Sequence, residues 1–220
     1  RAVVSEFIGT FALCFIGIGS IAAAAATGGG LIIPALAHGL VIACLASAVG
    51  HISGGHFNPA VSLAMLLTNR MKAADAGAYI VAQVLGAIAG SFAVAYALGS
   101  TAMMGIKHGI PAFSAPVMTG QAIVVEIILT FFLVFVIFGT AVDSKAPKMA
   151  ALFIGLTVTL DILMGGPVTG ACMNPARYLG PAVASGNFGQ ILTYMIGPIV
   201  GGGLAALVYD KVLMDKTTAS

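Results

Sequence analysis

The chain has 220 residues, of which 60% are hydrophobic and only 7% are charged. Soluble domains carry about 25% charged residues, so these side chains are too few to cover a water-facing surface, and the expected partner is a lipid bilayer. The net charge of +2 is too small and too scattered for nucleic-acid binding. The three cysteines lack metal-ligand spacing, so neither a metal site, a cofactor nor a disulfide framework is expected.

Six stretches are long enough to span a membrane. A spanning helix needs about 20 apolar residues to cross a hydrocarbon core of about 30 Å. The stretches that meet this requirement are residues 3–26, 31–52, 76–98, 120–142, 149–166 and 190–213.

Two further segments, residues 58–68 and 174–184, are helix-like and apolar but short. Each would be about 16 Å long at 1.5 Å per residue, so neither crosses the bilayer alone. Laid end to end, the two make about one span. The sequence therefore predicts an all-α membrane protein with six transmembrane helices and two re-entrant half-helices.

The basic residues of the loops fall on one side of the membrane if the chain crosses it six times. They are Arg1, Arg70, Lys72, Lys145, Lys148, Lys211 and Lys216. Lys107 alone among the loop lysines and arginines falls on the other side. Cytoplasmic loops carry an excess of Lys and Arg, so we expect a multi-pass protein of the cell membrane with both termini in the cytoplasm.

An internal repeat divides the chain into residues 1–99 and 118–214, joined by an outer loop, 100–117, within a single channel domain. Each half has a glutamate in its first span, Glu6 or Glu126, followed about 50 residues later by Asn-Pro-Ala. Three spans per half is an odd number, so the second half must be inverted relative to the first. Inverted repeats with broken helices place the functional site at the midplane, between the halves.

The two Asn-Pro-Ala triplets carry the chemistry of the predicted site. Asparagine is a favoured N-cap, and proline fits the first helical position, so each triplet starts a short helix and the inversion brings the two starts together. The amide NH₂ groups then remain free to donate, and two helix N-termini add positive potential. Water is accepted there, whereas cations and protons meet a barrier. The triplets are Asn58-Pro59-Ala60 and Asn174-Pro175-Ala176.

The stretches before the triplets are rich in glycine and not helical. Unwound backbone at membrane depth is tolerated where it lines a cavity or is buried in protein, so we expect a ladder of carbonyl acceptors along the pore. The residues assigned to this ladder are Gly54, Gly55, His56, Phe57, Gly170, Cys172 and Met173. Glu6 and Glu126 are expected to accept hydrogen bonds from these stretches and pin them; a plain helix-end glutamate is the alternative for Glu6.

These residues resemble the aquaporin (major intrinsic protein) family. The resemblance rests on the two triplets, on residues 50–54 (Gly-His-Ile-Ser-Gly) and on residues 173–177 (Met-Asn-Pro-Ala-Arg), and it covers essentially the whole chain. It implies a homotetramer with one pore per subunit and passive conduction of water and small neutral solutes.

The resemblance also assigns a narrow selectivity filter to four positions: His38, Ile162, Ala171 and Arg177. This combination is similar to that of plant tonoplast intrinsic proteins, some of which also pass ammonia or urea. Arg177 is a fixed charge that repels cations, and Ile162 and Ala171 leave an apolar wall. For His38 two interpretations stand: a donor to water or ammonia, or a hydrogen-bonded core histidine. Tyr178 occupies the place at which glycerol facilitators carry aspartate.

Three further residues keep two interpretations each. Asp161 lies inside a span, where an acid is costly, and is either a hydrogen-bond partner of the loop that carries Ala171 or a proton relay. His108 either supports Arg177 or is an exposed loop residue, and Cys172 is either a site of mercurial block or a buried thiol.

The sequence thus predicts a passive channel for water and small neutral solutes such as ammonia. A facilitator for glycerol or a metalloid acid is the first alternative, and an ion-coupled transporter that uses Asp161 is the second. An enzyme is not expected, because no nucleophile–base pair or metal cluster is recognisable.

Overall fold

The structure, a computed structural model, describes residues 1–214 and is built of helices. Within these residues six helices are long and apolar enough to cross a membrane. They are α1 (Ala2–Thr27), α2 (Ile32–Ser53), α4 (Ala73–Gly105), α5 (Thr119–Ile137), α6 (Ala150–Thr169) and α8 (Ile191–Val208). Two short helices, α3 (Pro59–Leu67) and α7 (Pro175–Ser185), complete the framework. The all-helical fold class with six spans is therefore confirmed.

The span boundaries agree closely with the sequence prediction except at α4. That helix continues seven residues beyond the predicted end at residue 98, with a kink at Gly99, where φ is 78°. A left-handed φ is readily adopted by glycine, so the chain bends at this point and then resumes the helix. The predicted outer loop therefore starts with a helical segment, and a single 3₁₀ turn, η1 (Lys107–Gly109), follows it.

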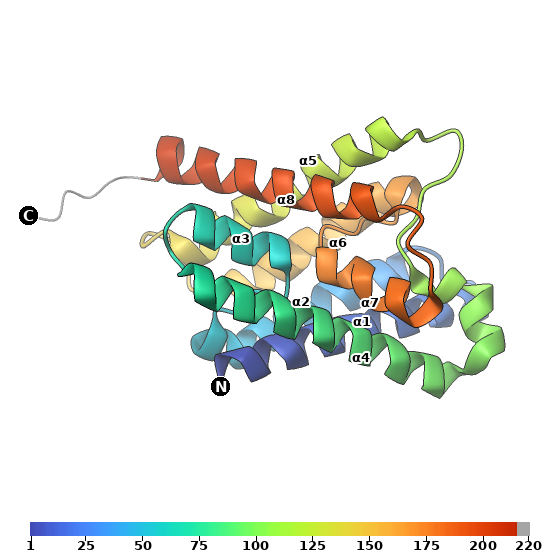
Figure 1. Cartoon of the computed structure of the whole chain (residues 1–220). Coiled ribbons are helices and arrows are strands. Elements are labelled where there is room, and N and C mark those ends of the chain that lie inside the picture. The colour runs from blue at the N-terminus through green and yellow to red at the C-terminus, as the bar shows by residue number, and fades with distance from the viewer. Residues whose placement is uncertain (215–220) are drawn as a thin grey trace, which may run out of the picture.

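The helices pack as two related sets. Helix α1 packs against α4, and α5 packs against α8 in the second set, while α2 and α6 contact each other across the boundary. In Figure 1, α3 and α7 lie inside this framework and approach the middle of the molecule from opposite ends. Arg1 and the end of α8 lie at the same end of the bundle.

We call that end the basic face. The segments that lie there are the start of α1, the connections between α3 and α4 and between α5 and α6, and the end of α8 (Figure 1), and they carry Arg1, Arg70, Lys72, Lys145, Lys148 and Lys211. Lys216, which the charge pattern also includes, lies outside the described residues.

Glycines allow the closest helix contacts. A Cβ atom at Gly86 of α4 would lie 2.2 Å from the carbonyl oxygen of Phe7 in α1, and one at Gly201 of α8 would lie 2.2 Å from that of Ile127 in α5. Between α2 and α6, a Cβ at Gly39 would lie 2.4 Å from the carbonyl oxygen of Gly155. Small residues are typical of such contacts between membrane helices, and here they bring the backbones into direct contact.

We expect Gly39→Ala to destabilise the fold, because the added methyl group meets backbone that cannot rotate away. Overpacking of this kind costs about 1–3 kcal/mol. The measurement is the thermal unfolding temperature of the protein in detergent. Gly77→Ala is the matched control: it is also a helical glycine, but a Cβ there meets no atom within 4 Å. Equal unfolding temperatures for the two variants would contradict the packing argument.

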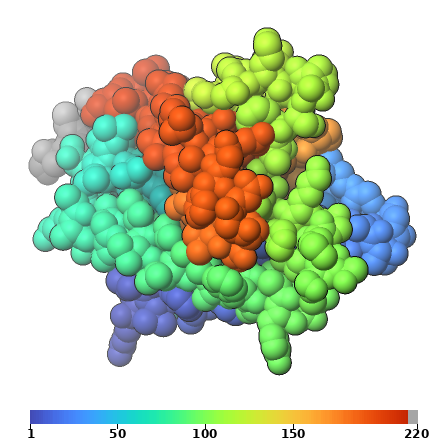
Figure 2. All heavy atoms as spheres, turned by 45° about the vertical axis from the view of Figure 1, so that its right-hand side comes forward, coloured from blue at the N-terminus to red at the C-terminus, as the bar shows by residue number. Residues whose placement is uncertain are grey.

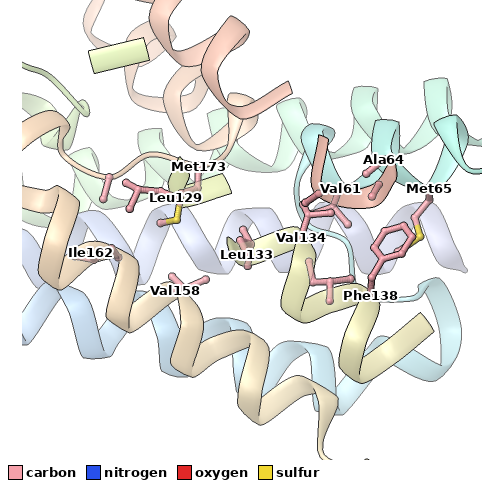
Figure 3. Close-up of a cluster of buried hydrophobic side chains, with 14 of the residues drawn as sticks. Val61, Ala64, Met65, Leu129, Leu133, Val134, Phe138, Val158, Ile162 and Met173 are labelled. Atoms are coloured by element: carbon pink, nitrogen blue, oxygen red, sulfur yellow. The ribbon is translucent and has the colours of Figure 1, made fainter. Parts of the chain in front are cut away.

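A buried apolar cluster joins the half-helix α3 to α5 and α6. Figure 3 shows Val61 and Met65 of α3 facing Val134 of α5 and Phe138, the residue that follows α5. Further along α5 the same cluster reaches Ile162 of α6. The cluster therefore fixes α3 against the helices that form one wall of the central cavity.

Candidate functional site

A narrow cavity runs through the middle of the bundle, with a volume of about 170 Å³. Ligand pockets for small molecules usually enclose 300–1,000 Å³, so this space suits only very small molecules. Its wall includes both unwound stretches and the filter positions assigned from the resemblance. The predicted residues that line it are His38, Gly54, Gly55, His56, Phe57, Asn58, Ile162, Ala171, Cys172, Met173, Asn174 and Arg177.

The remaining wall is apolar and was not assigned from the sequence. Two stripes with a spacing of four residues face the cavity: Leu133 and Ile137 on α5 with Ala141 just beyond it, and Ile154 and Val158 on α6, four and eight residues before the predicted Ile162. This spacing places side chains on one face of a helix. In a membrane helix every face is apolar, however, so the pattern has no polar contrast from which the stripes could be recognised.

The two asparagines cap the half-helices as predicted. The side-chain oxygen of Asn58 accepts a hydrogen bond from the backbone N–H of Ala60 at 2.9 Å, and that of Asn174 accepts one from Ala176 at 3.0 Å. Proline follows each cap at the first helical position. The N-termini of α3 and α7 therefore both point at the centre of the cavity.

Each asparagine also donates to the opposite half. Asn58 Nδ2 donates to the carbonyl oxygen of Met173 at 2.8 Å, and Asn174 Nδ2 donates to that of Phe57 at 2.8 Å. An amide NH₂ carries two hydrogens, so one of each pair is engaged and one remains for the cavity. The sequence prediction left both hydrogens free, and it is corrected here. The correction follows from how closely the two halves approach.

The first unwound stretch is tied to Glu6. Its Oε1 accepts from the Ser53 hydroxyl at 2.7 Å and from the His56 backbone N–H at 3.0 Å. Its Oε2 accepts from the Phe57 N–H at 2.7 Å and from Gln83 Nε2 at 2.7 Å. Glu6 is fully buried, so it is not a plain helix-end glutamate.

Glu126 does the same in the second half. Its Oε1 accepts from the Thr169 hydroxyl at 2.6 Å and the Cys172 N–H at 2.9 Å, and its Oε2 accepts from the Met173 N–H at 2.8 Å. The two carboxylates thus hold their loops by matching contacts. Carboxylates that accept backbone N–H bonds make the stronger, charge-assisted kind of hydrogen bond.

A second set of contacts that sequence reasoning missed supports the loops. The hydroxyl of Tyr79 donates to the carbonyl oxygen of Ser53 at 2.9 Å, and that of Tyr194 donates to Thr169 at 2.7 Å. The two tyrosines lie in corresponding spans, α4 and α8. The sequence signal that would have identified them is a tyrosine at a corresponding position in the third span of each half of the repeat.

The carbonyl ladder differs from the prediction at one residue. Gly170 does not line the cavity. The carbonyl oxygens of Phe57 and Met173 each accept one asparagine N–H and keep a second lone pair for the cavity that both residues line. The loops nevertheless depart from helix geometry as expected, since six residues have positive φ: Gly54, Gly55, Phe57, Gly170, Ala171 and Met173.

Arg177 is held on two sides. Its Nη1 donates to the carbonyl oxygen of Gly109 at 3.0 Å, and its Nε donates to His38 Nε2 at 3.3 Å. The other ring nitrogen of His38, Nδ1, lies 2.7 Å from the carbonyl oxygen of Pro34. A carbonyl only accepts, so Nδ1 carries the proton and Nε2 is an acceptor. His38 therefore orients Arg177 and has no N–H left for a solute, unlike the donor interpretation.

Ile162 and Ala171 complete the apolar side of this end of the cavity, and both are buried. Tyr178, by contrast, points away from it. Its ring stacks on Tyr194 with centroids 4.7 Å apart, and its hydroxyl accepts a hydrogen bond from the Gln190 N–H. Tyr178 therefore packs α7 against α8 and does not line the cavity.

The three residues with open interpretations resolve in part. Asp161 is buried, its Oδ2 has no hydrogen-bond partner, and it does not line the cavity, so the predicted bond to the loop of Ala171 is not formed. His108 is half-buried, and the neighbouring carbonyl of Gly109, not the imidazole, contacts Arg177. The thiol of Cys172 donates to the carbonyl oxygen of Asn174. Among residues 1–214 no cluster of His, Cys, Asp and Glu suits a metal ion.

A six-span bundle with two opposed half-helices, whose asparagines meet in a narrow central cavity, defines a membrane channel. A model of the major intrinsic protein family matches residues 1–209. The lens fiber major intrinsic protein of Lithobates pipiens is 42% identical over 218 residues, covering 98% of this chain and 82% of that protein. Aquaporin TIP4-4 of Zea mays is 40% identical over 227 residues, covering 98% and 88%.

Among solved structures, the aquaglyceroporin from Plasmodium falciparum superposes with a TM-score of 0.84 at 26% identity, covering 96% of each chain. The chain belongs to the major intrinsic protein family, and it is a multi-pass membrane channel rather than an enzyme. The relatives are nearly equally similar and come from a vertebrate lens and from a plant, so overall identity does not single out the tonoplast branch.

Proposed function

We propose that the chain is a passive channel for water and small neutral solutes such as ammonia, and that it excludes ions and protons. The observation that carries this proposal is the pair of asparagines at the two half-helix N-termini, each with one amide hydrogen left for the cavity. A water molecule passing this point accepts hydrogen bonds from both asparagines. Its own hydrogens then point away along the channel, which interrupts a proton-conducting chain of waters.

Charge exclusion follows from the same region. Each helix N-terminus carries roughly half a positive charge, and Arg177 adds a full one nearer the end of the cavity opposite the basic face. Among the described residues that line the cavity there is no carboxylate. Glu6 and Glu126 point their oxygens into the loops instead. A cation therefore meets positive potential at two places without a compensating acid.

The filter supports small solutes beyond water. Arg177 has five N–H donors, of which two are engaged by His38 and Gly109, so three remain for an oxygen or nitrogen lone pair. Ile162 and Ala171 add no competing polar group. The same four filter residues carry the resemblance to the tonoplast group, and this supports ammonia as a second solute.

The test is a stopped-flow comparison in proteoliposomes of water, ammonia and glycerol fluxes. We expect rapid water and ammonia fluxes and slow glycerol flux. The structural similarity to an aquaglyceroporin makes glycerol the specific alternative, and a glycerol flux comparable to the water flux would favour it. Ion-coupled transport relied on Asp161, which does not line the cavity. Uptake that collapses with the proton gradient would favour coupling.

We expect His38→Phe to lower ammonia flux more than water flux. Phenylalanine is larger than the imidazole and fills the filter, and it offers no acceptor to Arg177 Nε, which currently donates to His38. A hydrogen bond to a charged group contributes about 1.5 kcal/mol or more, so its loss changes the rate by roughly tenfold. The ratio of ammonia to water permeability is the measurement, and an unchanged ratio would contradict a role for His38 in the filter.

Three further assignments belong to the same proposal: the two inverted repeats form one channel domain, the basic face lies in the cytoplasm, and four copies assemble with one pore each. The distribution of Lys and Arg supports the orientation. The family resemblance supports the tetramer. Protease accessibility of the loop at residues 143–149 in sealed vesicles tests the orientation, and light scattering of the detergent-solubilised protein tests the copy number.

A further inference from the structure

A cluster at the basic face touches the wall of the cavity but plays no part in the site described above. Helices α5 and α8 both end in a π-helical turn, η2 (Phe138–Val142) and η3 (Tyr209–Leu213). The two turns contact each other. π-Helical turns are rare, and they also occur at helix C-termini, as both do here. Ala141 and Val142 of η2 line the cavity near the basic face.

Arg70, which follows the half-helix α3, connects the two turns. Its Nη1 donates to Asp210 Oδ1 of η3 at 2.8 Å, and its Nη2 donates to the Met214 sulfur at 3.2 Å. The same guanidinium lies 5.4 Å from the ring centroid of Phe138, the first residue of η2. Arginine over an aromatic face is a favourable cation–π contact. One side chain thus holds both π-helical turns.

The contact between Arg70 and Phe138 is linked to the cavity wall in two ways. The Phe138 ring is fully buried and lies beside Met65 of α3 (Figure 3), and Met65 itself lines the cavity. Along the chain, Phe138 is followed directly by the turn that carries Ala141 and Val142. The ring of Tyr209 packs against the outer side of η2. A Cβ atom added at Gly139 of η2 would lie only 3.1 Å from that ring.

We propose that Arg70 is a positioning residue of the channel, which holds η2 and Met65 back from the cavity and keeps its basic-face end open. The surrounding wall is apolar, and apolar side chains gain contacts when they close on a gap. Without the restraint, Phe138 moves with η2 and the mouth narrows. The inference rests on the proposed water channel, because it concerns the width of that pathway.

The main experiment is the water permeability per channel of Arg70→Gln in proteoliposomes. We expect a reduction of roughly threefold to thirtyfold, the size of the shift that one exposed ion pair and one cation–π contact together exert on an open-to-closed ratio. Lys72→Gln is the matched control. Lys72 lies two residues further on, is exposed, and forms no ion pair with another residue of the described chain. Its removal is expected to leave permeability unchanged.

Two measurements separate positioning from loss of structure. The charge swap Arg70→Asp with Asp210→Arg restores the ion pair but not the ring contact, so it is expected to recover permeability in part. A cysteine introduced at Val142 is expected to react more slowly with a charged thiol reagent in Arg70→Gln than in the otherwise unaltered protein. A cysteine at Ser144, in the exposed loop beyond η2, is expected to react at the same rate in both.

Ionic strength provides a further readout. Salt screens exposed ion pairs, so equal salt on both sides of the vesicle is expected to lower the permeability of the unaltered protein and to leave Arg70→Gln unaffected. Unchanged permeability and unchanged labelling at residue 142 in Arg70→Gln would overturn the inference. If the unaltered protein conducts no water, the proposed function fails, while the labelling at residue 142 still tests the position of η2.

Discussion

Replacing Asn174 with aspartate is expected to let monovalent cations through the channel. The two half-helix N-termini together contribute roughly one positive charge at the centre, and a carboxylate there offsets it. A barrier lowered by only 1.4 kcal/mol raises flux tenfold, so we expect at least about a tenfold increase in cation conductance. The measurement is current across planar bilayers that contain the variant, with water permeability followed in parallel.

The control for that experiment addresses the lost hydrogen bond. Asn174 donates to the Phe57 carbonyl, and aspartate cannot, so a leak could also arise from loosened packing. Asn174→Ala loses the same donor without adding a charge, and its cation conductance is expected to stay as low as that of the unaltered protein. Acidifying the solution should close the leak of the aspartate variant, because a protonated carboxyl is neutral. A leak of equal size in the alanine variant would contradict the electrostatic account.

The second large effect is expected for Glu126→Gln. The amide retains one acceptor oxygen and turns its NH₂ toward donors, so at least one of the Thr169, Cys172 and Met173 contacts is lost. Hydrogen bonds to charged groups contribute about 1.5–3 kcal/mol each. We therefore expect a marked fall in unfolding temperature in detergent, together with a loss of water permeability, since the loop that carries the filter is released.

Asp161→Asn is the matched control for that variant. Both changes convert a buried acid in a span to its amide, but Asp161 Oδ2 has no hydrogen-bond partner. Replacing an unpaired buried acid by a neutral group removes a cost and no contact, so stability is expected to stay level or rise. If both variants lose stability equally, the destabilisation comes from the amide at membrane depth and not from the loop contacts.

The features that sequence reasoning predicted are those fixed by local rules. Asparagine is a favoured N-cap and proline a favoured first helical residue, so both half-helices could be placed from Asn58 and Asn174, each followed by a proline and an apolar run. An acid inside an apolar run needs partners, which pointed to Glu6 and Glu126. The same rule gave a wrong partner for Asp161, because an acid that needs a partner is not guaranteed to have one.

The features that were missed depend on how the two halves fit together. The bonds from Asn58 to Met173 and from Asn174 to Phe57 join residues more than 110 positions apart, and no local pattern encodes their distance. His38 was left with two roles because its proton is placed by the Pro34 carbonyl, which requires the ring orientation. Gln83 was overlooked because a single amide in a run rich in alanine and glycine does not indicate which way its side chain points.

The unequal ends of the cavity have a consequence for inhibitors. At the centre of the cavity the two halves present matching asparagines. Arg177 and His38 lie at one entrance only, and the opposite entrance is bordered by aliphatic side chains such as Val142 and Ile154. A blocker applied outside the filter is stopped by polarity and width before it reaches Asn174. A narrow, apolar blocker applied from the basic face enters the cavity further. Sensitivity to such inhibitors is therefore expected to depend on the side of the membrane to which they are applied.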